Sequence, residues 1–150
     1  MSFLSSATVT ELLAREAAAG VTSAVYYGGF QERANSIKDD LLVFLIEAKR
    51  SNKSVAAYGA AAKGNTLLNY CGIGRDFIDY TVDLNPHKQG RFLPGTRIPI
   101  LDPDEIRRTQ PDLVFILPWN IRDEVMEQLA FVRDWGGRFA ARSPEIRIFP

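Results

Sequence analysis

The spacing of hydrophobic residues changes character about one third of the way along the chain. In the first third, apolar residues recur at steps of three and four, the period of an α-helix with one buried face. This spacing predicts a long helix over residues 30–50, whose apolar positions are Phe30, Ala34, Ile37, Leu41, Leu45 and Ala48. An earlier helix is predicted from the capping box Thr8-Val9-Thr10-Glu11 to Gly20. We therefore expect a helical lead-in over residues 1–52.

Beyond residue 52, short apolar runs alternate with helix-like segments, which is typical of a parallel α/β sheet. The expected strands are Ser54–Tyr58, Phe77–Val82, Ile98–Ile100, Leu113–Leu117 and Arg138–Ala141, and Glu145–Phe149 is a candidate edge strand. Asp102-Pro103-Asp104-Glu105 predicts one helix start, and Asn120 is expected to cap the next helix. The expected fold is an open, mainly parallel sheet flanked by helices. We predict a single domain, in which residues 1–52 pack on an α/β core of residues 53–150.

Composition limits the classes of function. The 18 basic and 18 acidic residues cancel, which argues against a sequence-independent nucleic-acid binder or a membrane-surface protein. With one cysteine, Cys71, and one histidine, the chain cannot build a zinc site from Cys and His alone or an internal disulfide, and we predict no metal site. We expect Cys71 to be a buried small residue. No run approaches the roughly 20 apolar residues of a membrane span, so we expect a cytoplasmic protein with no membrane partner.

The segment Ser54–Tyr70 predicts an anion site. It combines an apolar strand, a tight turn at Gly59 and a helix that follows Gly64, and the N–H groups at such a helix start can hold an anion. Lys63 adds a cation beside them. We therefore expect the backbone from Ala60 to Asn65, together with the Lys63 side chain, to meet a phosphorylated ligand.

Neither common nucleotide fingerprint fits this segment. The pattern G-x-x-x-x-G-K-[ST] has Asn65 where its lysine belongs, so nucleoside triphosphate hydrolysis is not expected. The pattern G-x-G-x-x-G lacks its middle glycine, although Asp83 stands 19 residues after Gly64, where a ribose-binding acid would lie. A tight strand–helix turn, in which the glycines serve packing only, is the alternative interpretation.

Two further polar segments follow expected strands, Asp83–Gly90 and Pro118–Asn120. In the common strand order 3-2-1-4-5, ligands bind beyond the carboxyl ends of the first and fourth strands, where connections leave in opposite directions. The residues expected to line this pocket are Asp83, Asn85, Lys88, Trp119 and Asn120, with the last two on its far wall. The alternatives are a solvated turn at the first segment and a tryptophan that closes the core edge at the second. No residue is assigned a catalytic role.

Three segments together resemble a known family. Tyr58–Ile73 (Y-G-A-A-A-K-G-N-T-L-L-N-Y-C-G-I), Asp83–Ile100 and Pro111–Asn120 closely resemble, in this order, the C-terminal domain of sugar C-methyltransferases. The resemblance covers essentially the whole chain. It implies a Rossmann-like fold, in a domain that follows a zinc-binding N-terminal domain and a central S-adenosylmethionine-binding domain.

The resemblance also implies a division of labour. In the family, the central domain carries the methyl donor and the acid–base residues, whereas the C-terminal domain helps hold a nucleotide-linked deoxysugar, typically a dTDP-sugar. S-adenosylmethionine and zinc are therefore expected in other domains, and methyl transfer by these 150 residues alone is not expected. The expected partners are the nucleotide sugar and the preceding methyltransferase domain. Two alternatives stay open: a stand-alone module that binds NAD(P) or a CoA-type ligand, and a structural or dimerisation domain.

Overall fold

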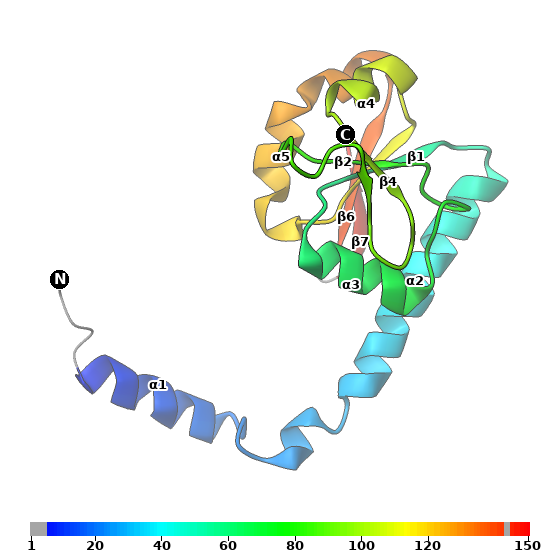
Figure 1. Ribbon diagram of the computed structural model, residues 1–150. Coiled ribbons are helices and arrows are strands. Elements are labelled where there is room, and N and C mark those ends of the chain that lie inside the picture. Colours follow the sequence, from blue (N-terminus) through cyan, green and yellow to red (C-terminus); the bar gives the residue numbers. More distant parts are fainter. Residues whose placement is uncertain (1–5, 143–144) are drawn as a thin grey trace. The chain divides into compact units, whose positions relative to one another are not determined.

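The computed structural model describes residues 6–142 and 145–150, and the chain divides into two compact units, Met1–Ser36 and Ile37–Pro150. The first unit contains helix α1 (Ser6–Ala18), the short 3₁₀ helix η1 (Ala24–Tyr27) and the start of helix α2 (Phe30–Arg50) (Figure 1). The bounds of α2 confirm the helix predicted from the apolar spacing. Within the second unit, α2 buries Leu41, Leu45 and Ala48. The expectation that residues 1–52 pack on the core as a lead-in stays a prediction.

The predicted capping box at Thr8 is wrong. Helix α1 already includes Ser6, so Thr8 lies inside its first turn and not at the position before it. The reason is local, because Ser6 and Ala7 are compatible with a helix and extend it towards the N-terminus. None of the helices among the described residues is long and apolar enough to cross a membrane.

Within the described residues of the second unit, a seven-stranded sheet has the order β3-β4-β2-β1-β5-β6-β7. Its strands are β1 (Val55–Tyr58), β2 (Thr81–Val82), β3 (Arg91–Phe92), β4 (Pro99–Leu101), β5 (Leu113–Ile116), β6 (Arg138–Arg142) and β7 (Ile146–Phe149). All neighbours pair in parallel except β3 with β4 and β6 with β7, which pair antiparallel at the two edges. The five central strands thus confirm the assumed order 3-2-1-4-5 and the Rossmann-like fold class.

Two strands differ from the prediction. The expected strand Phe77–Val82 is shortened to β2, because the N–H groups of Phe77 and Ile78 both donate to the Gly74 carbonyl in a turn (3.1 Å each). Strand β3 was not predicted. It has only two residues, both exposed, and so carries no alternation of buried and exposed positions that a sequence pattern could reveal.

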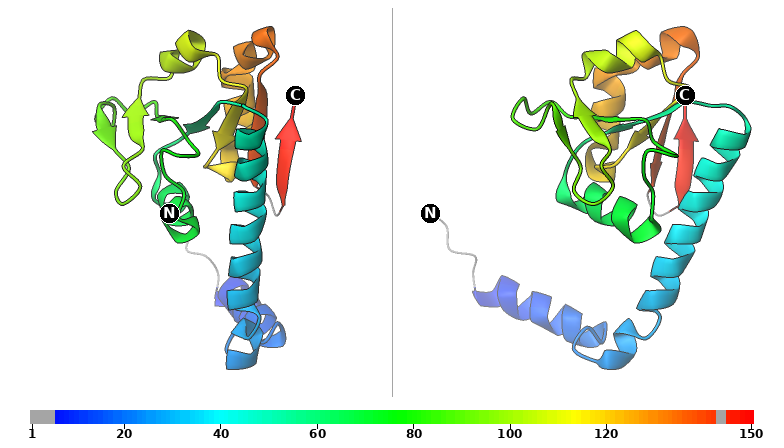
Figure 2. Two further views of the ribbon diagram at one scale, coloured as in Figure 1. Left: turned by 90° about the vertical axis from the view of Figure 1, so that its right-hand side faces the viewer. Right: turned by 45° about the vertical axis from the view of Figure 1, so that its right-hand side comes forward.

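Helices cover both faces of the sheet (Figures 1 and 2). On one face, α2 and α3 (Ala62–Cys71) pack in a core that includes Leu41, Leu68 and Phe115. Cys71 is buried in this core, as predicted. On the other face lie α4 (Asp104–Thr109), α5 (Arg122–Gln128) and the 3₁₀ helix η3 (Ala130–Trp135). Their core residues Ile106, Val125 and Val132 belong to a second apolar cluster. The sheet is therefore buried on both sides, as a parallel sheet requires.

The two predicted caps have different outcomes. Helix α4 begins at Asp104, yet the Asp102 carboxylate still accepts a hydrogen bond from the Asp104 N–H at 2.9 Å and satisfies the helix start. Asn120 does not cap α5. It lies within the 3₁₀ helix η2 (Trp119–Ile121), and α5 starts at Arg122 without a side-chain cap. The extra turn separates Asn120 from α5 and leaves its side chain available for another contact.

Candidate functional site

The carboxyl ends of β1 and β5, where the sequence predicts the binding crevice, lie next to each other in the sheet. These strands are parallel neighbours, and Tyr58 at the end of β1 pairs with Ile116 at the end of β5. The chain leaves β1 for α3 on one face of the sheet and leaves β5 for η2 and α5 on the other. This is the switch point at which open parallel sheets bind their ligands.

Gly59 and Gly64 allow the loop after β1 and the first turn of α3 to lie close to the residues that follow β5. Gly59 has φ +97°, and a Cβ atom there would lie 2.8 Å from the Pro118 Cδ atom. A Cβ atom on Gly64 would lie 2.7 Å from the Leu117 Cβ atom. Both glycines therefore have a packing role, as the alternative interpretation expected. The same packing fixes the first turn of α3 against the end of β5.

At this switch point, the first turn of α3 has backbone N–H groups without a hydrogen-bond partner among the described residues. Its first helical residue is Ala62, and Ala61 before it makes no side-chain capping hydrogen bond. The first hydrogen bond of the turn runs from the Asn65 N–H to the Ala61 carbonyl (3.1 Å), so the N–H groups of Ala61–Gly64 have no partner within the helix. No described residue outside the helix accepts from them either. Such a helix start attracts anions.

Lys63 joins α3 to η2, the short helix that follows β5. Its Nζ atom donates a hydrogen bond to the Asn120 Oδ1 atom at 3.2 Å and lies 4.9 Å from the centroid of the Trp119 ring. Trp119 keeps 37% of its surface exposed and so does not simply close the core. An ammonium group has three N–H donors, and this geometry leaves some of them available. The structure thus brings together three of the residues predicted for the site.

Asp83 joins two loops. Its Oδ2 atom accepts hydrogen bonds from the Ala60 N–H at 2.7 Å and from the Lys88 ammonium group at 3.0 Å, and its Oδ1 atom accepts from the Asn85 N–H at 2.9 Å. The Gln89 amide donates to the Asp83 carbonyl oxygen at 2.9 Å. Asp83 therefore connects the turn that follows β2 to residues 59–61, the glycine loop between β1 and α3. The Asp83 side chain is only 13% exposed.

These contacts determine the charge of Asp83 and its surroundings. Burial raises the pKa of the Asp83 carboxyl, but hydrogen bonds from the Asn85 N–H, the Ala60 N–H and Lys88 outweigh burial and hold the pKa below its ordinary value. Asp83 is therefore ionised at neutral pH and balances the charge of Lys88. Lys63, by contrast, has no carboxylate partner among the described residues. It supplies the uncompensated positive charge of this site.

The predicted site residues thus fall into two groups. Lys63, Trp119 and Asn120 contact one another beside the first turn of α3, which Gly64 holds in place. Asp83 and Lys88 pair with each other. Several predicted ligand groups have protein partners in this structure: the N–H groups of Ala60 and Asn65, and the Asn85 Oδ1 atom, which accepts from the His87 N–H at 3.0 Å. Their contact with a ligand stays a prediction.

Two supporting residues were not predicted. The hydroxyl of Thr81, which is fully buried in β2, donates to the Gly59 carbonyl at 3.0 Å and so holds the turn. The Tyr58 hydroxyl donates to the Gln128 Oε1 atom at 3.1 Å. Buried hydroxyl groups need hydrogen-bond partners, so a threonine inside an apolar run and a tyrosine at its end could have indicated these contacts. Among the described residues, no group of three or more His, Cys, Asp or Glu side chains could hold a metal ion.

The family described as "C-methyltransferase C-terminal domain" matches residues 3–144. The chain belongs to this family. Among its relatives, C-methyltransferase NovU from Streptomyces niveus is 34% identical over 140 residues, which are 93% of this chain and 33% of that protein. The chain therefore spans about a third of the length of this relative. The family resemblance found in the sequence is confirmed.

A solved structure is also similar. The crystal structure of UDP-D-quinovosamine 4-dehydrogenase from Vibrio fischeri matches 65% of this chain and 93% of its own chain, with a TM-score of 0.47 and 17% sequence identity.

Proposed function

We propose that this C-methyltransferase C-terminal domain holds a nucleotide-linked deoxysugar of the dTDP type. In this proposal a preceding central domain supplies the methyl donor and the acid–base groups, so S-adenosylmethionine and zinc belong to other domains of a cytoplasmic enzyme of deoxysugar biosynthesis. The observation that carries the proposal is the position of Lys63, between the uncapped start of α3 and the residues Trp119 and Asn120.

The diphosphate is the part of the ligand that suits this arrangement best. The N–H groups of Ala61–Gly64 and the Lys63 ammonium group lie on the same first turn of α3, and all of them can donate to phosphate oxygens. Each hydrogen bond to a charged group contributes about 1.5–3 kcal/mol. The centroid of the Trp119 ring lies 4.9 Å from the Lys63 Nζ atom, so the ring can pack against the sugar attached to the diphosphate.

Two observations favour a sugar nucleotide over NAD(P). The sequence lacks the middle glycine with which dinucleotide-binding folds bring the backbone close to the pyrophosphate. Asp83, which stands where a ribose-binding acid would lie, instead accepts hydrogen bonds from the Ala60 N–H and Lys88. A ribose would have to compete with both contacts.

Titration of the 150-residue chain tests the proposal. Amide chemical shifts and melting temperature are followed with dTDP, a dTDP-linked deoxysugar, NAD and S-adenosylmethionine. We expect saturable binding of the two dTDP compounds, with the largest shifts at residues 61–64 and at the Trp119 indole. Lys63→Ala should weaken dTDP binding about tenfold, because it removes one charge-assisted hydrogen bond. Lys53→Ala is the matched control, because Lys53 precedes β1 and therefore lies at the opposite end of that strand.

The outcomes separate the candidate functions. Saturable binding of NAD alone would contradict the sugar-nucleotide proposal. Absence of binding by all four compounds would favour a structural domain. Equal dTDP affinity in the Lys63→Ala and Lys53→Ala variants would show that the anion does not lie at α3.

A further inference from the structure

A second cleft, of about 290 Å³, opens beside the turn that follows β2. Leu84 and Gln89 contribute from this turn, Arg107 from α4, and Gln128 and Phe131 from the end of α5 and the start of η3. Typical small-molecule pockets measure about 300–1,000 Å³. The cleft therefore suits a single ring system and is too small for a complete nucleotide sugar.

Two glutamine side chains connect this cleft to β1 and the loop that follows it. Gln89 donates to the carbonyl of Asp83, whose carboxylate accepts from the Ala60 N–H of the glycine loop. Gln128 accepts from the hydroxyl of Tyr58, the residue directly before Gly59. The cleft thus begins next to the residues that position the proposed diphosphate site.

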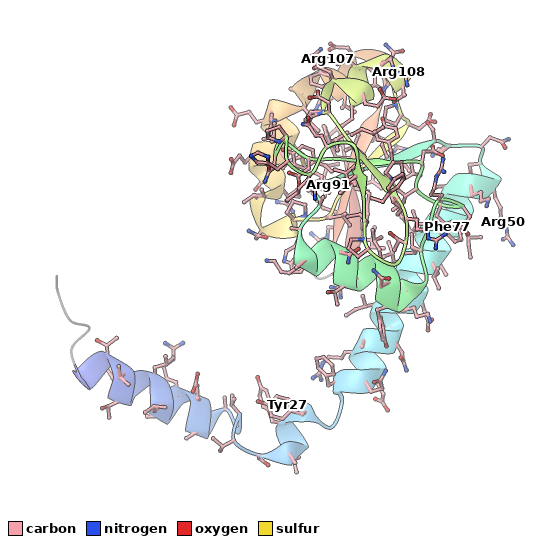
Figure 3. All side chains as sticks on the ribbon, in the orientation of Figure 1. Tyr27, Arg50, Phe77, Arg91, Arg107 and Arg108 are labelled. Carbon is pink, nitrogen blue, oxygen red and sulfur yellow. The ribbon has the colours of Figure 1, made fainter. Side chains whose placement is uncertain are left out.

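Arg107 gives the cleft a flat, polar surface. Its Cζ atom lies 3.4 Å from the centroid of the Phe131 ring, so the aromatic ring supports the guanidinium group from one side. Figure 3 labels Arg107 and its neighbour Arg108 on α4. Arg107 forms no ion pair with the described residues, whereas Arg108 pairs with Glu105. Guanidinium groups stack on nucleobases. Leu84, which is 59% exposed, adds apolar surface to the same cleft.

The remaining hydrogen-bonding atoms fit the edge of a pyrimidine-dione ring. Gln89 uses its Nε2 atom on Asp83, and Gln128 uses its Oε1 atom on Tyr58. Among the described residues no partner is found for the Gln89 Oε1 atom, an acceptor, or for the Gln128 Nε2 group, a donor. Thymine and uracil present an N–H donor between two carbonyl acceptors. With Arg107 stacked on the face of the ring, the cleft offers the acceptor of Gln89 for this N–H group and the donor of Gln128 for one of the carbonyls.

The charge of the cleft excludes the phosphates. Asp102 and Asp104 line it as well and outnumber Arg107. A phosphate group would meet net negative charge here, whereas a neutral base would not. We propose that the cleft between the turn after β2 and helices α4 and α5 binds the pyrimidine base of the nucleotide whose diphosphate lies at α3. This inference rests on the proposed function and assigns to it a separate base-binding subsite.

Three probes test the two subsites independently on the 150-residue chain: thymidine, inorganic pyrophosphate and dTDP. Amide and side-chain amide shifts are recorded in titrations with each probe. We expect thymidine to shift Leu84 and the side-chain amides of Gln89 and Gln128, and pyrophosphate to shift residues 61–64. Arg107→Ala should weaken dTDP binding about tenfold, the effect of losing one stacked base, and leave pyrophosphate binding unchanged. Arg108→Ala is the matched control on the same helix.

Each result decides between the two proposals. Pyrophosphate shifts at residues 61–64 without thymidine shifts at the cleft would retain the diphosphate site and overturn the base subsite. Thymidine shifts at the cleft without pyrophosphate shifts at α3 would support the cleft and overturn the diphosphate site. Equal dTDP affinity in Arg107→Ala and Arg108→Ala, with both variants melting like the wild type, would also overturn the base subsite.

Discussion

Asp83 is the residue whose replacement tests the architecture of the site most directly. Its carboxylate accepts hydrogen bonds from Ala60, Asn85 and Lys88, and it is the side chain that fastens the turn after β2 to the glycine loop. We predict that Asp83→Ala destabilises the second unit and loosens the loop that leads into α3. Asp83→Asn should cost less, because an amide oxygen can still accept one N–H while the ion pair with Lys88 is lost.

The magnitude follows from the contacts. Removing the acceptor leaves the Ala60 N–H, which is partly buried, without its partner, and an unsatisfied buried donor costs about 1–3 kcal/mol. The ion pair with Lys88, whose side chain is 38% exposed, adds about 0–1 kcal/mol. We therefore expect Asp83→Ala to lose about 1–4 kcal/mol, or roughly 2–16 °C in melting temperature.

The loss should depend on pH. The pKa of Asp83 in the folded state lies below its ordinary value, so the folded protein favours the ionised carboxylate. The stabilisation is then fully present above the unfolded pKa, near about pH 4, and is lost as the pH falls through the lower folded pKa. The difference in unfolding free energy between wild type and Asp83→Ala should therefore shrink as the pH falls below about 4.

Urea unfolding followed by tryptophan fluorescence measures this difference, because Trp119 and Trp135 both lie in the second unit. Unfolding free energies are compared at about pH 7 and about pH 3. Asp79→Asn, at an exposed carboxylate shortly before β2, is the control for general charge effects. A loss at neutral pH below about 0.5 kcal/mol, the range of ordinary surface substitutions, would refute the structural role of Asp83. A loss that does not change between the two pH values would refute the electrostatic part of the reasoning.

Two further predictions concern α3. Gly64→Ala should lower the free energy of unfolding in urea by about 1–2 kcal/mol, because the steric overlap with Leu117 costs more than the roughly 1 kcal/mol that alanine gains over glycine in a helix. A variant as stable as the wild type would contradict the close packing. Ala61→Asp supplies the missing cap and should raise the free energy of unfolding by about 0.5–2 kcal/mol in the same assay. Because the new carboxylate occupies the helix start, it should also weaken pyrophosphate binding. Stronger binding would contradict the assignment of the anion to this turn.

The sequence was sufficient for those parts of the fold that rest on long or strongly patterned segments. The bounds of α2 and the strands β1 and β5 follow from helical spacing and unbroken apolar runs, and the strand order follows the common topology. Strand β3 could not be predicted, because its two exposed residues are held by pairing with β4 and by no pattern of their own. Short edge strands depend on tertiary contacts that a local pattern does not encode.

The candidate site shows the same limit at the level of side chains. Sequence spacing placed Asp83 and Gly59 at the carboxyl ends of neighbouring strands, and the structure confirms that proximity. Spacing could not reveal that the Ala60 N–H group donates a hydrogen bond to the Asp83 carboxylate, because this contact depends on the parallel register of β1 and β2. Likewise, Asn120 reads as a helix cap in the sequence, and only the 3₁₀ turn η2 directs it towards Lys63.

Packing explains both glycines of the loop, so they cannot by themselves distinguish a binding site from a tight turn. Two other features favour a binding site. A domain that served only as a scaffold would gain about 0.5–2 kcal/mol from Ser, Thr, Asp or Asn before α3, yet Ala61 occupies that position. It would also have no need to hold an uncompensated ammonium group beside the same turn, and Lys63 is held there by Asn120 and Trp119. An uncapped helix start and a cation at one place are both unfavourable for the empty protein and both favourable once an anion binds. Their coincidence at the switch point is the strongest argument that α3 receives a phosphate group.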